Sequence, residues 1–291
     1  MHYSRLKPYL MVLPVVVFMG VFIYALLNTL VQSFGILPAA GLNEWTLSYY
    51  QALLLRGDLL PSLWLSLYYS SVSSLLAVFM GVLISALAVS SGFTRMKIFQ
   101  IFKVPIIVPH LAAALLILNL FSQSGIISRV LYQLNWVQSP QQFPALLFDP
   151  YALGIILAYL WKEVPFVIMM VVTIMAKIDG SIGEAAVNLG ASKFKTFHSI
   201  TLPLCLPTIY TSFLLVFAYS FGAFEIPFLL GMTSPKALPV LAYLEYTHPD
   251  LAHRPYAMAL NGVMVVLSVM LTYVYYRIIK GDRQVKAGGD Y

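Results

Sequence analysis

Residues 179–203 read DGSIGEAAVNLGASKFKTFHSITLP, a polar stretch between two long apolar stretches. Ser181 is followed three residues later by Glu184, and this pattern is typical of a capping box at the start of a helix. Gly190 lies where the residue after a helix enters the left-handed conformation. The stretch therefore predicts a helix of about two turns that begins at a cap and ends before a glycine.

The predicted helix has an apolar face, because its apolar residues recur at helical spacing. A helix this short is marginal in water and needs a surface to pack against. Ser192 caps a second segment with basic and aromatic residues, as in an interfacial helix, before Leu202-Pro203 turns into the next apolar stretch. This helix–turn–helix either docks a cytoplasmic protein or folds over the membrane surface as a connector. Its apolar face comprises Ile182, Ala185, Ala186 and Leu189.

The composition outside this stretch is that of a membrane protein. Of the 291 residues, 60% are hydrophobic and only 10% are charged, whereas soluble domains carry about 25% charge. A membrane-spanning helix needs about 20 apolar residues, and such stretches are too long for barrel strands. We therefore predict an all-α integral membrane protein with six transmembrane helices, at Tyr9–Phe34, Pro61–Ser90, Pro105–Phe121, Tyr151–Ala176, Leu204–Leu230 and Tyr256–Tyr276.

The lysine and arginine residues predict the orientation. Twelve lie on the side that holds both termini and four on the other, while Lys162 lies inside a predicted span. This bias places both termini in the cytoplasm. The charge is spread over several segments rather than gathered into a nucleic-acid surface, and the single cysteine excludes an intramolecular disulfide. The twelve are Arg5, Lys7, Arg95, Lys97, Lys103, Lys177, Lys193, Lys195, Arg277, Lys280, Arg283 and Lys286.

The cytoplasmic stretch resembles the conserved loop of permease subunits from binding-protein-dependent ABC importers. That loop has the pattern EAA, three residues, G, nine residues, I, any residue, LP. Here Glu184-Ala185-Ala186, Gly190, Ile200 and Leu202-Pro203 match every spacing. The resemblance implies the type I permease fold over residues 1–291 as a single transmembrane domain, in a bacterial inner membrane. It also implies a coupling loop at about 177–203, in which Glu184, Ala185, Ala186 and Gly190 contact the ATPase.

The same resemblance implies the partners of the chain. The sequence contains no P-loop motif, so it cannot hold ATP phosphates in that way. ATP and Mg²⁺ are expected on a separate pair of ATP-binding subunits, and this chain is expected to be a transport subunit with no cofactor, metal or catalytic residue. A second permease subunit, identical or homologous, and an external solute-binding protein complete the expected assembly.

Three ionisable residues are candidates for the solute path. Lys162 and Glu163 lie in the middle of the fourth predicted span, close to Pro165, and Glu225 lies near the outer end of the fifth. Charge at mid-membrane is costly and marks function or pairing, so Lys162 and Glu163 either line a path or form a structural salt bridge with the second permease. An ion-coupled secondary carrier that uses this pair is the alternative function, although such carriers commonly show repeated halves, and none is found here.

The solute is predicted only as a class. Asn188–Ser192 and Phe224–Gly231 are similar to permeases of the spermidine/putrescine group, and Trp161–Phe166 is similar to a stretch of sugar permeases. Acidic residues and aromatic rings favour a polyamine-like cation through ionic and cation–π contacts, with ferric iron, sulfate, thiamine and sugars as alternatives.

Overall fold

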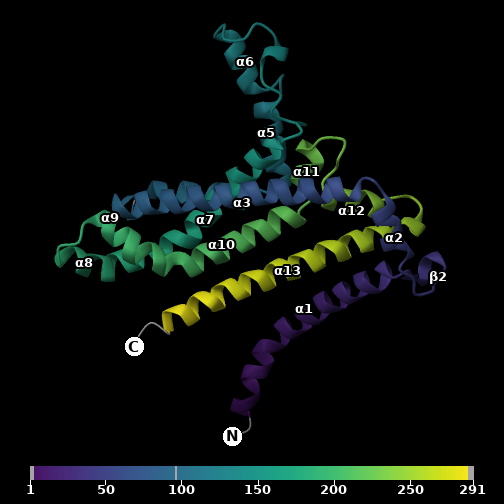
Figure 1. Cartoon of the computed structure of the whole chain (residues 1–291), viewed down its shortest axis with the longest axis horizontal. Helices are drawn as coiled ribbons and strands as arrows, with labels where there is room; N and C mark the ends of the chain where they lie inside the picture. The colour runs from purple at the N-terminus through teal and green to yellow at the C-terminus, as the bar shows by residue number, and fades with distance from the viewer. Residues whose placement is uncertain (1–2, 96, 288–291) are drawn as a thin grey trace. The chain divides into compact units, whose positions relative to one another are not determined.

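The computed structural model describes residues 3–95 and 97–287. They divide into two compact units, the first formed by residues 1–59 and 241–267 and the second by 60–240 and 268–291. The described residues include six helices that are long and apolar enough to cross a membrane, so the all-α, six-helix prediction is confirmed (Figure 1). They are Tyr9–Ser33, Leu59–Ser90, His110–Gln133, Leu153–Asn188, Lys193–Gly222 and Leu251–Arg277.

The first unit begins with a helix and a small hairpin. Helix α1 (Tyr3–Ser33) is followed by strands β1 (Ile36–Leu37) and β2 (Leu42–Asn43), which pair antiparallel with Ile36 opposite Asn43. Gly41 ends the connecting turn with a φ of 73°, a conformation that glycine adopts without a steric penalty. Helix α2 (Ser48–Leu55) follows the hairpin. The hydroxyl of Tyr50 on α2 donates to the hydroxyl of Ser33, the last residue of α1, at 2.8 Å.

An ion-pair network joins the two stretches of the first unit. Arg56 binds Glu245 at 2.5 Å and Asp58 at 2.9 Å, and Nδ1 of His253 lies 2.7 Å from the other oxygen of Glu245. Glu245 belongs to α12 (Leu238–Tyr246), and His253 precedes α13 (Arg254–Ala287). Burial raises the pKa of Glu245, but the hydrogen bonds and charges of Arg56 and His253 outweigh burial and lower that pKa below its ordinary value.

The second unit has α7 (Leu153–Ile178) at its centre. Two thirds of its most apolar window is buried, against a third or less for the other five spans. Helix α3 (Leu59–Ser90) packs on α7. The ring of Tyr69 on α3 stacks on the ring of Tyr159 on α7, with 6.0 Å between the ring centroids. Helix α10 (Leu202–Gly222) packs on α7 as well. Cys205 is fully buried in this core, as expected for a small apolar residue.

Two of the predicted spans are broken in the structure. The third divides into α4 (Val104–Ile107) and α5 (His110–Phe121), because Pro109 between them cannot donate a helical hydrogen bond. The predicted fifth span ends with α10 at Gly222, and a separate helix α11 (Glu225–Leu230) follows. A short helix, α6 (Ile126–Gln133), follows α5. In Figure 1, α5 and α6 point away from α3 and α7.

The Glu245 network makes stability depend on pH in a defined window. A carboxyl whose pKa is lowered by folding contributes stability above its ordinary pKa of 4.5 and loses it as the pH falls through the folded value. We expect Glu245→Gln to cost about 1 kcal/mol at neutral pH and to flatten the acid side of the pH–stability curve.

Thermal unfolding of the purified protein between about pH 3 and pH 7 measures this dependence. Glu44→Gln is the matched control, because Glu44 is exposed and has no ion pair recorded among the described residues. Parallel pH curves for the wild type and Glu245→Gln would show that the network does not stabilise the fold.

Gly81 on α3 allows the close approach of α7. A Cβ at this position would lie 2.5 Å from Cγ1 of Val167, which is itself fully buried. We expect Gly81→Ala to lower the free energy of unfolding by about 1–3 kcal/mol through overpacking. Gly20→Ala is the control, because nothing lies within 4 Å of that Cβ. Equal thermal stability of the two variants would contradict the close packing of α3 on α7.

Candidate functional site

The predicted coupling segment forms the inner end of α7. After α7, a π-helical turn (Asp179–Gly183) runs without interruption into α8 (Glu184–Asn188). The expected capping box is therefore wrong: the hydroxyl of Ser181 donates to the carbonyl of Lys177 at 2.8 Å and caps no helix start. The local pattern did not show that the helix continues, because Gly180 and Gly183 favour an interruption at this turn.

The end of α8 agrees with the prediction at Gly190. Its φ is 92°, its amide donates to the carbonyl of Val187 at 2.9 Å, and the amide of Ala191 donates to Ala186 at 3.0 Å. These two bonds form a Schellman motif, which needs a residue in the left-handed region after the helix. Gly190 thus fixes the direction in which the chain leaves α8.

The second half of the segment is also continuous with a span. Ser192 caps α9 (Lys193–Thr196) by accepting from the amide of Lys195 at 3.3 Å, as predicted. A second π-helical turn (Phe197–Thr201) joins α9 directly to α10. Leu202-Pro203 therefore makes no turn and continues the helix as the first two residues of α10.

The apolar face of α8 has no partner among the described residues. Leu189 is 90% exposed and Ile182 is 50% exposed, and Glu184 and Ala185 are exposed as well. Ala186 is half-buried. Exposed large apolar residues at the polar end of a membrane protein mark an interaction surface. We call Ile182, Glu184, Ala185, Ala186, Leu189 and Gly190 the α8 surface.

Lys162 is engaged within its own unit. Its side chain is buried, and its ammonium group donates to the carbonyls of Pro105, at 3.2 Å, and Val108. These carbonyls lie at the break between α4 and α5, where Pro109 leaves helical hydrogen bonds unmade. Lys162 therefore satisfies backbone groups that the broken third span exposes, and it forms no ion pair with Glu163 or another described acid.

Glu163 differs from its neighbour. It is 4% exposed, and neither carboxylate oxygen has a hydrogen-bond partner among the described residues. The hydroxyls of Ser73 on α3 and Ser220 on α10 lie beside it, outside hydrogen-bonding geometry. Because adjacent helical residues point about 100° apart, Lys162 and Glu163 have separate surroundings.

A cavity of about 300 Å³ borders both residues. His110 begins α5 and lies against this cavity, with its Nδ1 2.8 Å from the hydroxyl of Tyr219 on α10. Glu225 is half-buried at the start of α11, close enough to His110 and Tyr219 to interact with them electrostatically. The cavity is lined by Ile106, His110, Lys162, Glu163, Phe166, Leu215, Val216 and Tyr219.

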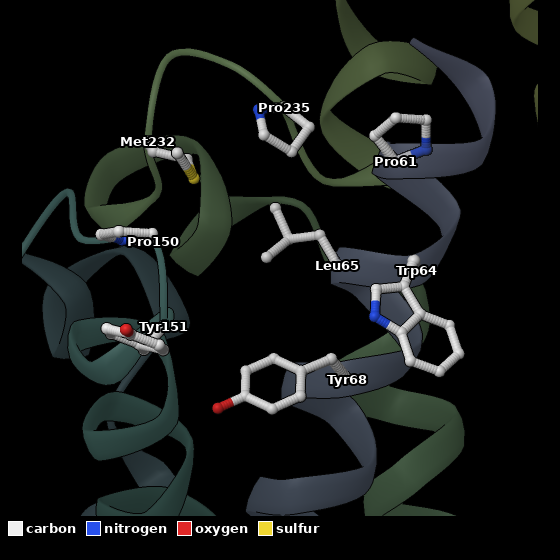
Figure 2. Close-up of a pocket in the computed structure, with 8 residues that line it drawn as sticks. All are labelled: Pro61, Trp64, Leu65, Tyr68, Pro150, Tyr151, Met232 and Pro235. Atoms are coloured by element: carbon white, nitrogen blue, oxygen red, sulfur yellow. The ribbon is translucent and has the colours of Figure 1, made fainter. Parts of the chain in front are cut away.

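A second cavity, of about 380 Å³, lies at the start of α3, and the sequence analysis did not predict it (Figure 2). Pro61, Trp64, Leu65 and Tyr68 line it at helical spacing, a pattern that was available in the sequence. Tyr68 points its hydroxyl toward the side that carries Tyr151 (Figure 2). The other lining residues, Pro150, Met232 and Pro235, come from loops, whose approach the sequence did not indicate.

Comparison with known proteins decides the family. A family described as "Binding-protein-dependent transport system inner membrane component" matches residues 73–283, which include the α8 surface, α7 and α10. The chain belongs to this family. It is therefore a permease subunit of an ABC importer and a multi-pass protein of the inner membrane. Permeases of this family are transport subunits, which agrees with the expected lack of catalysis at the level of the family.

The individual relatives agree on the class and differ in solute. The molybdate/tungstate transport system permease protein WtpB of Pyrococcus abyssi is 27% identical over 72% of this chain and 75% of its own length. The spermidine/putrescine transport system permease protein PotB of Haemophilus influenzae is 31% identical, over 44% of each chain. The chain thus spans less than half of this second relative. An alginate importer structure has a TM-score of 0.75 at 19% identity, covering 95% of this chain and 98% of its own, and supports the fold.

The described residues offer no cluster of three His, Cys, Asp or Glu side chains placed to hold a metal ion. The candidate functional residues lie in two parts of the structure. One is the α8 surface, and the other is the cavity beside Lys162 and Glu163.

Lys162 is expected to stabilise the break between α4 and α5. Lys162→Met would leave two buried carbonyls without their charged donor, and we expect a loss of about 1–3 kcal/mol in stability. Hydrogen exchange of residues 104–112 should accelerate more than that of α10. Lys177→Met is the matched control, because Lys177 is exposed near the end of the same helix. Unchanged exchange at residues 104–112 in Lys162→Met would contradict this role.

Proposed function

We propose that this permease subunit receives the movement of an ATP-hydrolysing partner through the α8 surface and uses it to open a path for a small solute. The observation that carries the proposal is the exposure of Leu189 and Ile182 at the end of a helix whose exit Gly190 fixes. Glu184, Ala185 and Ala186 lie on the same segment, and the small alanines allow a partner to approach closely. ATP and Mg²⁺ would be bound by that partner.

The path itself is proposed to border the cavity beside α7. Lys162 and Glu163 line this cavity, and Glu225 lies close to its residues His110 and Tyr219. An external binding protein would deliver the solute, and a second permease, identical or homologous, would complete the enclosure. The ammonium group of Lys162 is satisfied by carbonyls whereas Glu163 lacks a donor, so the cavity favours cationic solutes. A polyamine-like cation is the proposed class, and ring contacts with Tyr219 would add cation–π attraction.

The ion-coupled carrier is not favoured by this geometry. A coupling pair needs Lys162 and Glu163 to exchange partners, but Lys162 is held by two backbone carbonyls of the α4–α5 break. We therefore retain the ATP-driven mechanism as the proposed function.

The backbone of Gly190 provides a sharp test of the α8 surface. A Cβ at this position meets nothing within 4 Å, so a substitution acts through its φ of 92° alone. A β-branched residue there is strained by about 1–3 kcal/mol, whereas asparagine tolerates this conformation. We expect Gly190→Val to reduce the amount of ATPase that co-purifies from native membranes, and Gly190→Asn to preserve it.

Quantitative mass spectrometry of the affinity-purified permease measures the bound ATPase. Gly180→Val is the matched control for adding a valine, because Gly180 is exposed, has an unstrained φ and has nothing within 4 Å of its Cβ. The proposal would be wrong if no ATPase accompanied the wild type, or if Gly190→Val retained as much ATPase as Gly180→Val.

A further inference from the structure

The carboxylate of Glu163 ends among hydroxyl groups from two other helices. Ser73 on α3 and Ser220 on α10 lie beside it, and both are fully buried. Glu163 itself is 4% exposed, and both of its oxygens lack a partner among the described residues. A buried polar group without a partner is unfavourable and calls for an explanation.

The hydrogen of Ser220 is already used elsewhere. A serine hydroxyl carries one hydrogen and two acceptor lone pairs. Ser220 donates to the carbonyl of Val216 at 2.8 Å, so in its 3.4 Å contact with Ser74 it accepts. Ser220 can therefore donate to Glu163 only by leaving the carbonyl of Val216, and its lone pairs are available to a bound cation.

The remaining hydroxyls do not compensate. Ser73 donates to the carbonyl of Ser70 at 3.3 Å, a longer bond from which it could turn toward Glu163. Tyr159 directs its hydroxyl hydrogen to the carbonyl of Ser220 at 3.2 Å. An ionised Glu163 would thus gain at most one donor for about four acceptor sites, and its other oxygen would face lone pairs.

A positive charge resolves this arrangement. We propose that Glu163, Ser73 and Ser220 form a binding site for one small monovalent cation, a sodium ion or a proton. Carboxylate and hydroxyl oxygens are hard ligands, which suit hard cations, and a cation between them turns the repulsion of their lone pairs into attraction. Lys162 does not supply this charge, because its ammonium group is bound to Pro105 and Val108.

The site is linked to the packing of the second unit. Its three residues come from α3, α7 and α10, so it is complete only while these helices are in contact. A ligand that binds one arrangement better than another shifts the population toward it. A bound cation would therefore stabilise the arrangement in which the three helices are packed together. Glu163 also lines the 300 Å³ cavity, and this cavity offers the cation a route of entry.

Direct binding of ²²Na⁺ to the purified permease complex, without solute or ATP, tests the sodium form. We expect saturable binding, abolished by Glu163→Gln and weakened about tenfold by Ser73→Ala, which removes one ligand oxygen. The milder serine variant keeps the test decisive if Glu163→Gln fails to fold. Glu44→Gln is the control, because Glu44 is an exposed carboxyl that lines neither the site nor the cavity, and it should bind sodium normally.

The dependence of unfolding on pH at constant sodium tests the proton form. A proton bound only by the folded protein gives stability that falls as the pH rises. We expect this decline in the wild type as the pH rises above the ordinary pKa of a carboxyl group, and its loss in Glu163→Gln. The titratable groups that surround Glu163 or line the same cavity are Tyr69, Tyr159, Lys162, His110, Tyr219 and Glu225.

His110→Gln is the control for that histidine and should keep the decline. Sodium binding identifies a sodium site, and a Glu163-dependent pH effect without sodium binding identifies a proton site. The proposal is overturned if sodium is not bound and the pH curves of the wild type and Glu163→Gln are parallel, or if sodium binds equally well to both. Neither readout needs an ATPase or a solute, so these outcomes are separate from those for the α8 surface.

Discussion

The bonds from the ammonium group of Lys162 to the carbonyls of Pro105 and Val108 are the contacts on which the interior of the second unit depends. A membrane offers no water to backbone groups, so a break in a spanning helix persists only where the protein satisfies the freed carbonyls. The break at Pro109 sets the direction of α5, which brings His110 to Tyr219 of α10. The cavity beside α7 therefore has its shape because a buried cation holds a broken helix in place.

Glu163 follows Lys162 in the sequence but points to a different neighbourhood, and this separation divides the roles of the two charges. Lys162 faces the α4–α5 break, where carbonyl oxygens are plentiful. Glu163 faces the serines of α3 and α10, whose hydroxyls donate to carbonyls of their own helices. The positive charge is thus satisfied by the fold and the negative charge is not. An unsatisfied charge in the core is the kind of group that a protein retains for function.

The sequence predicted much of this structure where the signal was long or local. Six spans follow from runs of apolar residues, and Gly190 and Ser192 adopt the predicted conformations because their roles are set by adjacent residues. The Ser181 cap was wrong because the same short pattern also fits inside a continuous helix. The carbonyl partners of Lys162 lie 54 and 57 residues away, and no periodic pattern in the sequence reports such a contact. The surroundings of Glu163 were hidden for the same reason, since they come from three helices.

The continuity that the capping signal concealed has a mechanical consequence. The α8 surface is joined to Glu163 by α7 without a loop, and α9 is joined to Ser220 by α10 in the same way. At a rise of 1.5 Å per residue, Glu184 lies about 31 Å along the helix from Glu163. A loop would absorb a displacement, whereas two continuous helices pass it on. A partner that moves α8 against α9 would therefore also move Glu163 against Ser220, at the point where their oxygens meet. The π-helical turns are the two places where this transmission can be adjusted, because such turns recur at functional sites of helices.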